Sequence, residues 1–139
     1  MSFQIIEILD SQPENVLAKV SHQNNQVTVI IPNEKLKDIV VGQSFQAEMS
    51  YDQILDWKII TDFDDAESGI WQEKDGVHLL GRIHSILDFG DGVTVIDVYM
   101  QNGPELFAVS LEAINNETLE DNDGFELTVC NLYLYPNDK

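Results

Sequence analysis

The side chains that could carry chemistry in this chain are its carboxylates, three histidines and one cysteine. Its 139 residues include 25 aspartates and glutamates against 7 lysines and arginines, a formal net charge of -18 at pH 7. Nucleophilic catalysis needs a nucleophile, a base and an orienting group, and no histidine lies beside a glycine-flanked serine of the nucleophile-elbow type. The sequence therefore favours a protein that is not an enzyme.

The histidines do not predict a metal site. His78 and His84 are six residues apart, so on one continuous strand they face the same side but lie about 20 Å apart. One ion cannot reach both without a bend in the strand, so we assign no metal ligands. A glycine-rich phosphate loop at a strand-to-helix junction is also absent from the sequence, and we expect no cofactor.

Two clusters of carboxylates lie within residues 61–139, at 62–67 and 117–123. Neither fits the twelve-residue calcium loop with its central glycine and final glutamate, so a solvated acidic loop is the simplest interpretation. If the clusters have a function, their carboxylates would meet lysines and arginines of a partner, with a tryptophan as the desolvated anchor. The candidate binding residues are Asp62, Asp64, Asp65, Glu67, Trp71, Glu120, Asp121 and Asp123.

Apolar and polar residues alternate with a period of two along most of the chain, which predicts half-buried strands. In the run 131–136, Leu132 and Leu134 share one face and Tyr133 and Tyr135 the other, so core-facing leucines would turn the tyrosines outward. Only two short helices are expected, at 33–40 and 111–119, which excludes helical and parallel α/β folds. The predicted strands cover 3–9, 15–22, 26–31, 43–50, 54–60, 77–87, 92–100, 105–109 and 124–135.

A weak internal repeat indicates how these strands are organised. The tetrapeptide VTVI occurs at 27–30 and again at 93–96, each time shortly after a similar strand. The fold class we expect is mostly β, with one or two small antiparallel barrels, OB-like or SH3-like in character, built from tandem half-repeats with short helices. The expected division is a first β subdomain at 1–61, an acidic connecting segment at 62–76 and a second β subdomain at 77–139. The two subdomains could also pack as a single domain.

Charge and cysteine content limit the partner and the compartment. Residues 1–60 contain 8 acidic and 4 basic residues, whereas residues 61–139 contain 17 and 3. Such a surface opposes direct binding of nucleic acid or of an anionic membrane and attracts basic proteins. Cys130 lies in an apolar run, so we expect a buried, inert thiol. We also expect no signal peptide or membrane span, and a cytoplasmic location.

Three functions remain open from the sequence. The first is an acidic binding protein that captures and neutralises a basic partner, such as a toxin or nuclease, in the manner of immunity proteins and nucleic-acid mimics. The second is a β-barrel interaction or accessory module of a larger assembly, with the charge serving solubility. The third is a small ligand-binding barrel or enzyme. The oligomeric state is left open.

Overall fold

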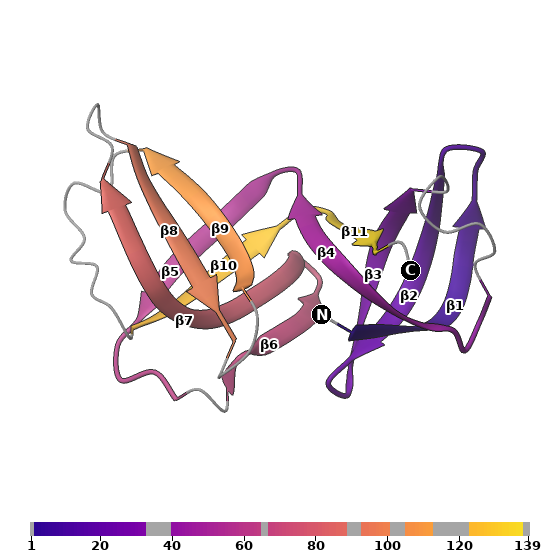
Figure 1. Ribbon diagram of the computed structural model, residues 1–139, viewed down its shortest axis with the longest axis horizontal. Coiled ribbons are helices and arrows are strands. Elements are labelled where there is room, and N and C mark those ends of the chain that lie inside the picture. Colours follow the sequence, from indigo (N-terminus) through magenta and orange to yellow (C-terminus); the bar gives the residue numbers. More distant parts are fainter. Residues whose placement is uncertain are drawn as a thin grey trace. The chain divides into compact units, whose positions relative to one another are not determined.

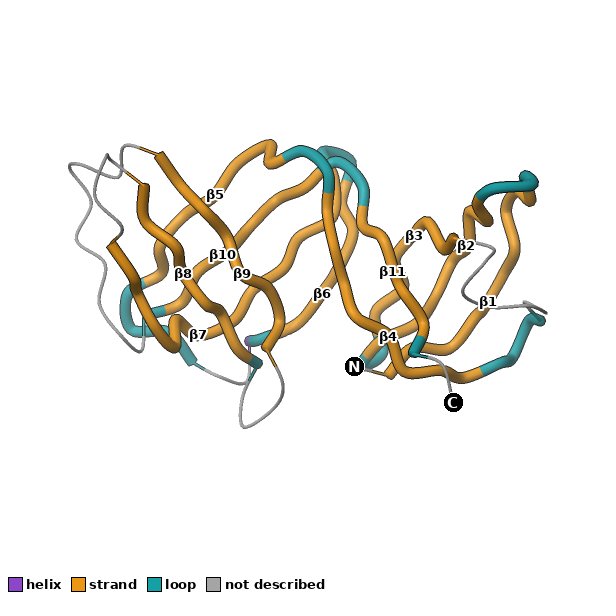
Figure 2. Tube along the Cα trace, turned by 45° about the horizontal axis from the view of Figure 1, so that its top comes forward, coloured by secondary structure: helices purple, strands orange, loops and turns teal. Residues whose placement is uncertain are grey.

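The computed structural model describes residues 2–32, 40–64, 67–88, 93–100, 105–112 and 123–137. Strands make up nearly all of this part of the chain (Figures 1 and 2). None of its segments forms a helix long and apolar enough to cross a membrane. In chain order the strands are β1 (Ser2–Ser11), β2 (Asn15–His22), β3 (Asn25–Pro32), β4 (Ser44–Tyr51), β5 (Ile54–Ile60), β6 (Gly69–Glu73), β7 (Gly76–Asp88), β8 (Val93–Tyr99), β9 (Glu105–Glu112), β10 (Gly124–Val129) and β11 (Leu132–Pro136).

The chain divides into two compact units, and neither is a continuous segment. Unit 1 comprises 1–55, 70–78 and 128–139, and unit 2 comprises 56–69 and 79–127. The expected division at 61 and 77 differs from this arrangement. The acidic segment 62–76 is not simply a connector, because its second half forms β6, where Ile70 is fully buried. Sequence periodicity cannot reveal such interleaving, which depends on strand pairing between distant residues.

Unit 1 contains a closed barrel with the strand order β1-β2-β3-β11-β4. The first three strands form a meander, β4 pairs with the start of β1, and β11 lies between β3 and β4. This is the order of a five-stranded Greek-key barrel of the OB type, with its fifth strand supplied by the far end of the chain. Register shifts in β1 between Ile5 and Glu7 and between Ile8 and Asp10 mark irregularities that let a strand coil and close a barrel.

Alternating residues of the unit 1 strands fill the barrel interior. Leu132 and Leu134 are buried while Tyr135 is exposed, which confirms the predicted orientation of the last strand. A two-residue turn joins β2 to β3, with Gln23 and Asn24 both at positive φ. The buried apolar side chains of this barrel are Phe3, Ile5, Val16, Ala18, Val20, Val27, Val29, Ile31, Ala47, Leu132 and Leu134.

The second sheet has the order β5-β10-β7-β8-β9, with β6 paired to β7. The closed barrel, followed from β3 in the direction of β2, has the order β3-β2-β1-β4-β11. The second sheet, followed from β9, has the matching order β9-β8-β7-β10-β5. The two VTVI copies, however, lie in β3 and β8, which occupy different places in the two orders. The repeated tetrapeptide therefore does not mark equivalent strands, because short alternating apolar runs suit any half-buried strand.

Strand β10 departs from the predicted alternation, since all six of its residues are buried. The predicted strand 124–135 is interrupted at Cys130 and Asn131, where Asp52 accepts hydrogen bonds from the backbone N–H and the side-chain amide of Asn131. The prediction of a buried thiol is wrong: Cys130 lies in this break and is exposed. Of the predicted helices, 33–40 lies outside the described residues apart from Val40, and 111–119 begins with the last two residues of β9.

Candidate functional site

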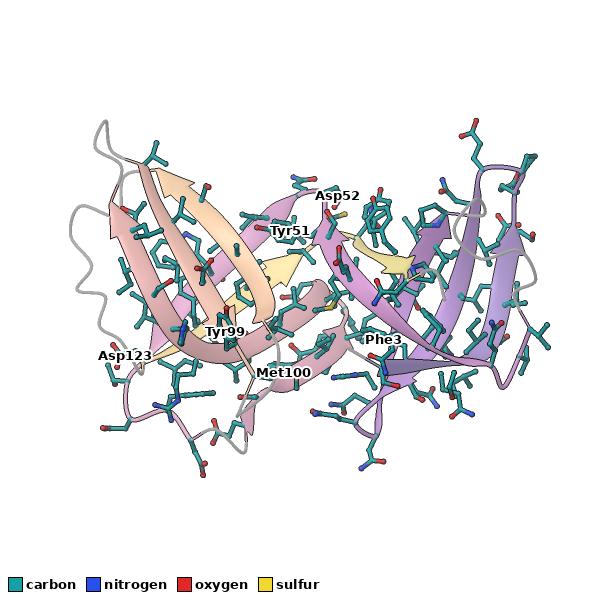
Figure 3. All side chains as sticks on the ribbon, viewed as in Figure 1. Phe3, Tyr51, Asp52, Tyr99, Met100 and Asp123 are labelled. Carbon is teal, nitrogen blue, oxygen red and sulfur yellow. The ribbon has the colours of Figure 1, made fainter. Side chains whose placement is uncertain are left out.

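The structure describes four of the seven predicted binding carboxylates, and all four lie in unit 2. Asp62, Asp64 and Glu67 are exposed on the loop between β5 and β6. The half-buried Asp123, labelled in Figure 3, immediately precedes β10. Asp62 takes a left-handed backbone conformation with φ 54°, and the backbone N–H of Glu67 donates to the carbonyl of Asp64 at 2.9 Å. We call these four residues the acidic surface.

The side chain of Phe63 joins the two parts of the acidic surface. It is buried, and its ring lies so close to Gly124 that a Cβ added there would be 2.5 Å from Cδ1 of the ring. The backbone N–H of Ile83 donates to the carbonyl of Asp123 at 2.8 Å, which fixes the approach to β10. Phe63 and Gly124, which are 61 positions apart in sequence, are thus held next to one another, so the structure brings together members of both predicted clusters.

Basic side chains are scarce in unit 2. Its residues include 15 aspartates and glutamates but only Lys58 and Arg82 as lysine or arginine, a formal charge of -13. The guanidinium of Arg82 lies 5.7 Å from the centroid of the Phe63 ring, a cation–π contact. The Nζ of Lys58 lies 3.7 Å from a carboxylate oxygen of the buried Glu126. Both positive charges therefore already have partners inside the unit.

The remaining predicted residues have different outcomes. Asp65, Glu120 and Asp121 lie outside the described residues. Trp71 belongs to β6 in unit 1, where it is half-buried and stacks on the imidazole of His78 with centroids 5.3 Å apart and planes 12° apart. This indole thus packs within its own unit.

A second group of polar side chains converges on His78 in unit 1. The Nε2 atom of His78 lies 2.9 Å from a carboxylate oxygen of Asp75 and 3.0 Å from one of Glu73. On the other side of the ring, Nδ1 lies 3.2 Å from the hydroxyl oxygen of Thr128. The His78 side chain is 7% exposed, whereas those of Glu73 and Asp75 are 58% and 64% exposed. The imidazole is thus fixed in the interior with one nitrogen turned toward two solvent-facing carboxylates.

The β6–β7 hairpin positions this group. Glu73 ends β6, Asp75 lies in the turn, and His78 is the third residue of β7. Gly76 between them has φ +153°, and a Cβ there would lie 2.4 Å from the carbonyl oxygen of Val129. Only glycine permits this close approach of β7 to β10, which sets Thr128 beside the His78 ring.

Hydrogen bonding and burial shift the pKa values of Asp75 and His22 in unit 1. The hydrogen bond with His78 is the main cause that lowers the pKa of Asp75 below its ordinary value. Burial lowers the pKa of His22, whose Nδ1 lies 2.9 Å from the carbonyl oxygen of Ser2. The Nε2 atom of His22 is buried without a hydrogen-bond partner. An uncharged His22 is therefore favoured inside the barrel.

The spacing between the histidines did not predict the His78 group, because the other ligand-type side chains of this group are carboxylates. The available signal was the spacing of Glu73, Asp75 and His78 across a turn ending in glycine, which places three ligand-type side chains on one hairpin. No protein-family model matches this chain, and no curated protein is significantly similar to it in sequence. The class that the fold defines is a small β-barrel protein with an OB-like barrel.

Proposed function

We propose that this protein is a non-enzymatic binding module that captures a basic partner protein through unit 2. The observation that carries the proposal is the charge of that unit, with 15 acidic and 2 basic residues. A field of this strength raises the local concentration of cationic partners and speeds their association. The same field opposes direct contact with nucleic acid, although OB-type barrels are often used for that purpose.

The acidic surface supports the proposal because it is ordered around a buried anchor. Phe63 packs against Gly124 and under Arg82, so the neighbouring carboxylates are held on a fixed backbone rather than on a loose chain. Preorganised charges lose less side-chain and loop entropy when a partner binds. A basic nuclease or toxin, whose own cleft carries lysines and arginines for phosphate, has the complementary chemistry.

The test is affinity capture from a lysate of the source cells on the immobilised protein, eluted with a rising salt gradient and identified by mass spectrometry. The proposal predicts that a basic protein is captured and is released as the salt concentration rises. Added salt shortens the Debye length, which is about 8 Å at physiological salt, and so screens the attraction between exposed charges. A captured protein that salt does not release would contradict it. Such a result would instead favour an accessory module that binds through exposed apolar side chains such as Leu9 and Leu17.

A further inference from the structure

We propose that Glu73, Asp75 and His78 form a binding site for one divalent transition-metal ion, with Zn²⁺ as the best match. Each residue offers one ligand atom, and the three atoms all lie within 4.8 Å of one another. They come from one hairpin in unit 1. The site is therefore independent of the acidic surface and of the function proposed for it.

The distances suit metal coordination. Zn²⁺ binds imidazole nitrogen and carboxylate oxygen at about 2.0–2.2 Å, so two ligands at right angles lie about 3.0 Å apart and two tetrahedral ligands about 3.4 Å apart. The Nε2 atom of His78 is 2.9 Å from Asp75 and 3.0 Å from Glu73. Both carboxylates are largely exposed and can rotate, so small adjustments complete the geometry around a fixed imidazole.

Charge and hydrogen bonding also favour a cation at this point. Carboxylate oxygens of Asp75 and Glu73 lie 2.9 and 3.0 Å from Nε2 of His78, so the negative charge of both converges on one imidazole nitrogen. A single proton on Nε2 points fully at one carboxylate, whereas a divalent cation attracts both. The Thr128 hydroxyl at 3.2 Å can accept a proton from Nδ1. With a metal ion on Nε2, this bond would hold the imidazole proton on Nδ1, as hydrogen-bond partners of metal-bound histidines do.

The ligand set indicates the kind of ion. One imidazole with two carboxylates suits Zn²⁺ better than Mg²⁺ or Ca²⁺, which prefer oxygen ligands alone. Three protein ligands leave at least one position for water. The Trp71 ring stacked on His78 covers one face of the imidazole and provides a spectroscopic reporter beside the site.

The proposal is tested with the full chain and zinc chloride near neutral pH by isothermal titration calorimetry. The expected result is saturable binding of one Zn²⁺ per chain that weakens by about tenfold or more in Asp75→Asn and in Glu73→Gln, which remove one ligand charge each. His84→Gln, which changes an exposed histidine of the same strand, and Asp62→Asn, which removes a carboxylate of unit 2, should bind as the wild type does.

Spectroscopy separates this site from adventitious binding to the acidic chain. In a Trp57→Phe background the remaining tryptophan, Trp71, should be quenched by Co²⁺, and Asp75→Asn should abolish the quenching at the same concentration. Long-range ¹H–¹⁵N spectra should show Zn²⁺ moving Nε2 of His78 while Nδ1 stays protonated. The proposal is overturned if Zn²⁺ does not bind, or if Asp75→Asn and Glu73→Gln leave binding unchanged. It is also overturned if Zn²⁺ does not affect the signals of the His78 ring. Because the two carboxylates are exposed, both amide variants should keep the wild-type circular dichroism spectrum.

Discussion

The packing of Phe63 on Gly124 predicts a strong coupling between these two positions. A Cβ at residue 124 would lie 2.5 and 2.6 Å from two ring carbons of Phe63, about 1 Å inside the ordinary carbon–carbon contact distance. Overpacking of this kind destabilises a protein by about 1–3 kcal/mol. Gly124→Ala should therefore lower the free energy of unfolding of unit 2 by about 2 kcal/mol. The same overlap should displace the loop that carries Asp62 and Asp64.

A double-mutant cycle gives the decisive comparison. Phe63→Ala removes the ring and destabilises by about 3 kcal/mol by itself, as expected for a buried aromatic residue. In that background Gly124→Ala should lower the free energy of unfolding by less than about 1 kcal/mol, because the nearest remaining atom of that side chain is its Cβ at 3.0 Å. The coupling energy between the two positions is then about 1–2 kcal/mol.

Urea denaturation followed by tryptophan fluorescence measures the cycle. In a Trp71→Phe background the signal comes from Trp57, which stacks on Phe125 inside unit 2 with centroids 5.5 Å apart. With an m-value of about 2 kcal/mol/M, the Gly124→Ala change moves the midpoint by about 1 M. If Gly124→Ala destabilises equally with and without the Phe63 ring, the two positions are not energetically coupled, and their packing does not hold the two parts of the acidic surface together.

Three further predictions concern unit 1. Burial lowers the pKa of His22 below 6.5. The unfolded state therefore takes up more protons than the folded state, and the free energy of unfolding should fall as pH drops below about 6.5. The urea midpoints at about pH 7 and pH 5.5 should differ less in His22→Gln than in wild type, and an equal difference in the two proteins would contradict this. The hydrogen bond with Asn131 is the main cause that lowers the pKa of Asp52 below 3.8. Because this carboxylate is exposed, Asp52→Ala should lower the free energy of unfolding by only about 0.5 kcal/mol at neutral pH. The difference from wild type should close as pH falls through the lowered pKa, and a difference that is constant with pH would exclude the charge as its cause. Gly76→Ala should destabilise by about 2–4 kcal/mol because of its φ and its overlap with the carbonyl of Val129, and a thermal melt like that of wild type would contradict this.

The strands were predictable because burial of one face leaves a period of two in the sequence. The exception is β6, whose buried Ile70 lies in an acidic, turn-rich segment and whose partner β7 supplies the hydrogen bonds. The split at Cys130 was also missed, since the break depends on Asp52, which is 79 residues from Asn131. Local patterns could not show that the last strand returns to close the first barrel.

The candidate sites were also only partly predictable from the sequence. The carboxylates of the acidic surface were evident from their density in the sequence, but their grouping around Phe63 depends on its contact with Gly124, 61 positions away. Trp71 was expected to act with these carboxylates, whereas its ring stacks on His78 within unit 1. The His78 group combines a local hairpin with the distant Thr128. Composition therefore predicted the charge, and only the fold determines which side chains meet.

The most direct test of partner capture is the association rate constant of the captured protein, measured by stopped flow over a range of ionic strength. One variant neutralises the acidic surface by substituting its four carboxylates with their amides. The matched control makes the same change in charge in unit 1, at Glu7, Asp10, Glu14 and Glu48, which are all exposed.

The account predicts that the acidic-surface variant associates about tenfold more slowly at low salt and with a flatter salt dependence. The unit 1 control should remain close to wild type in both respects. Equal effects of the two variants would show that only total charge matters, and unchanged rates in both would remove electrostatic capture from the account.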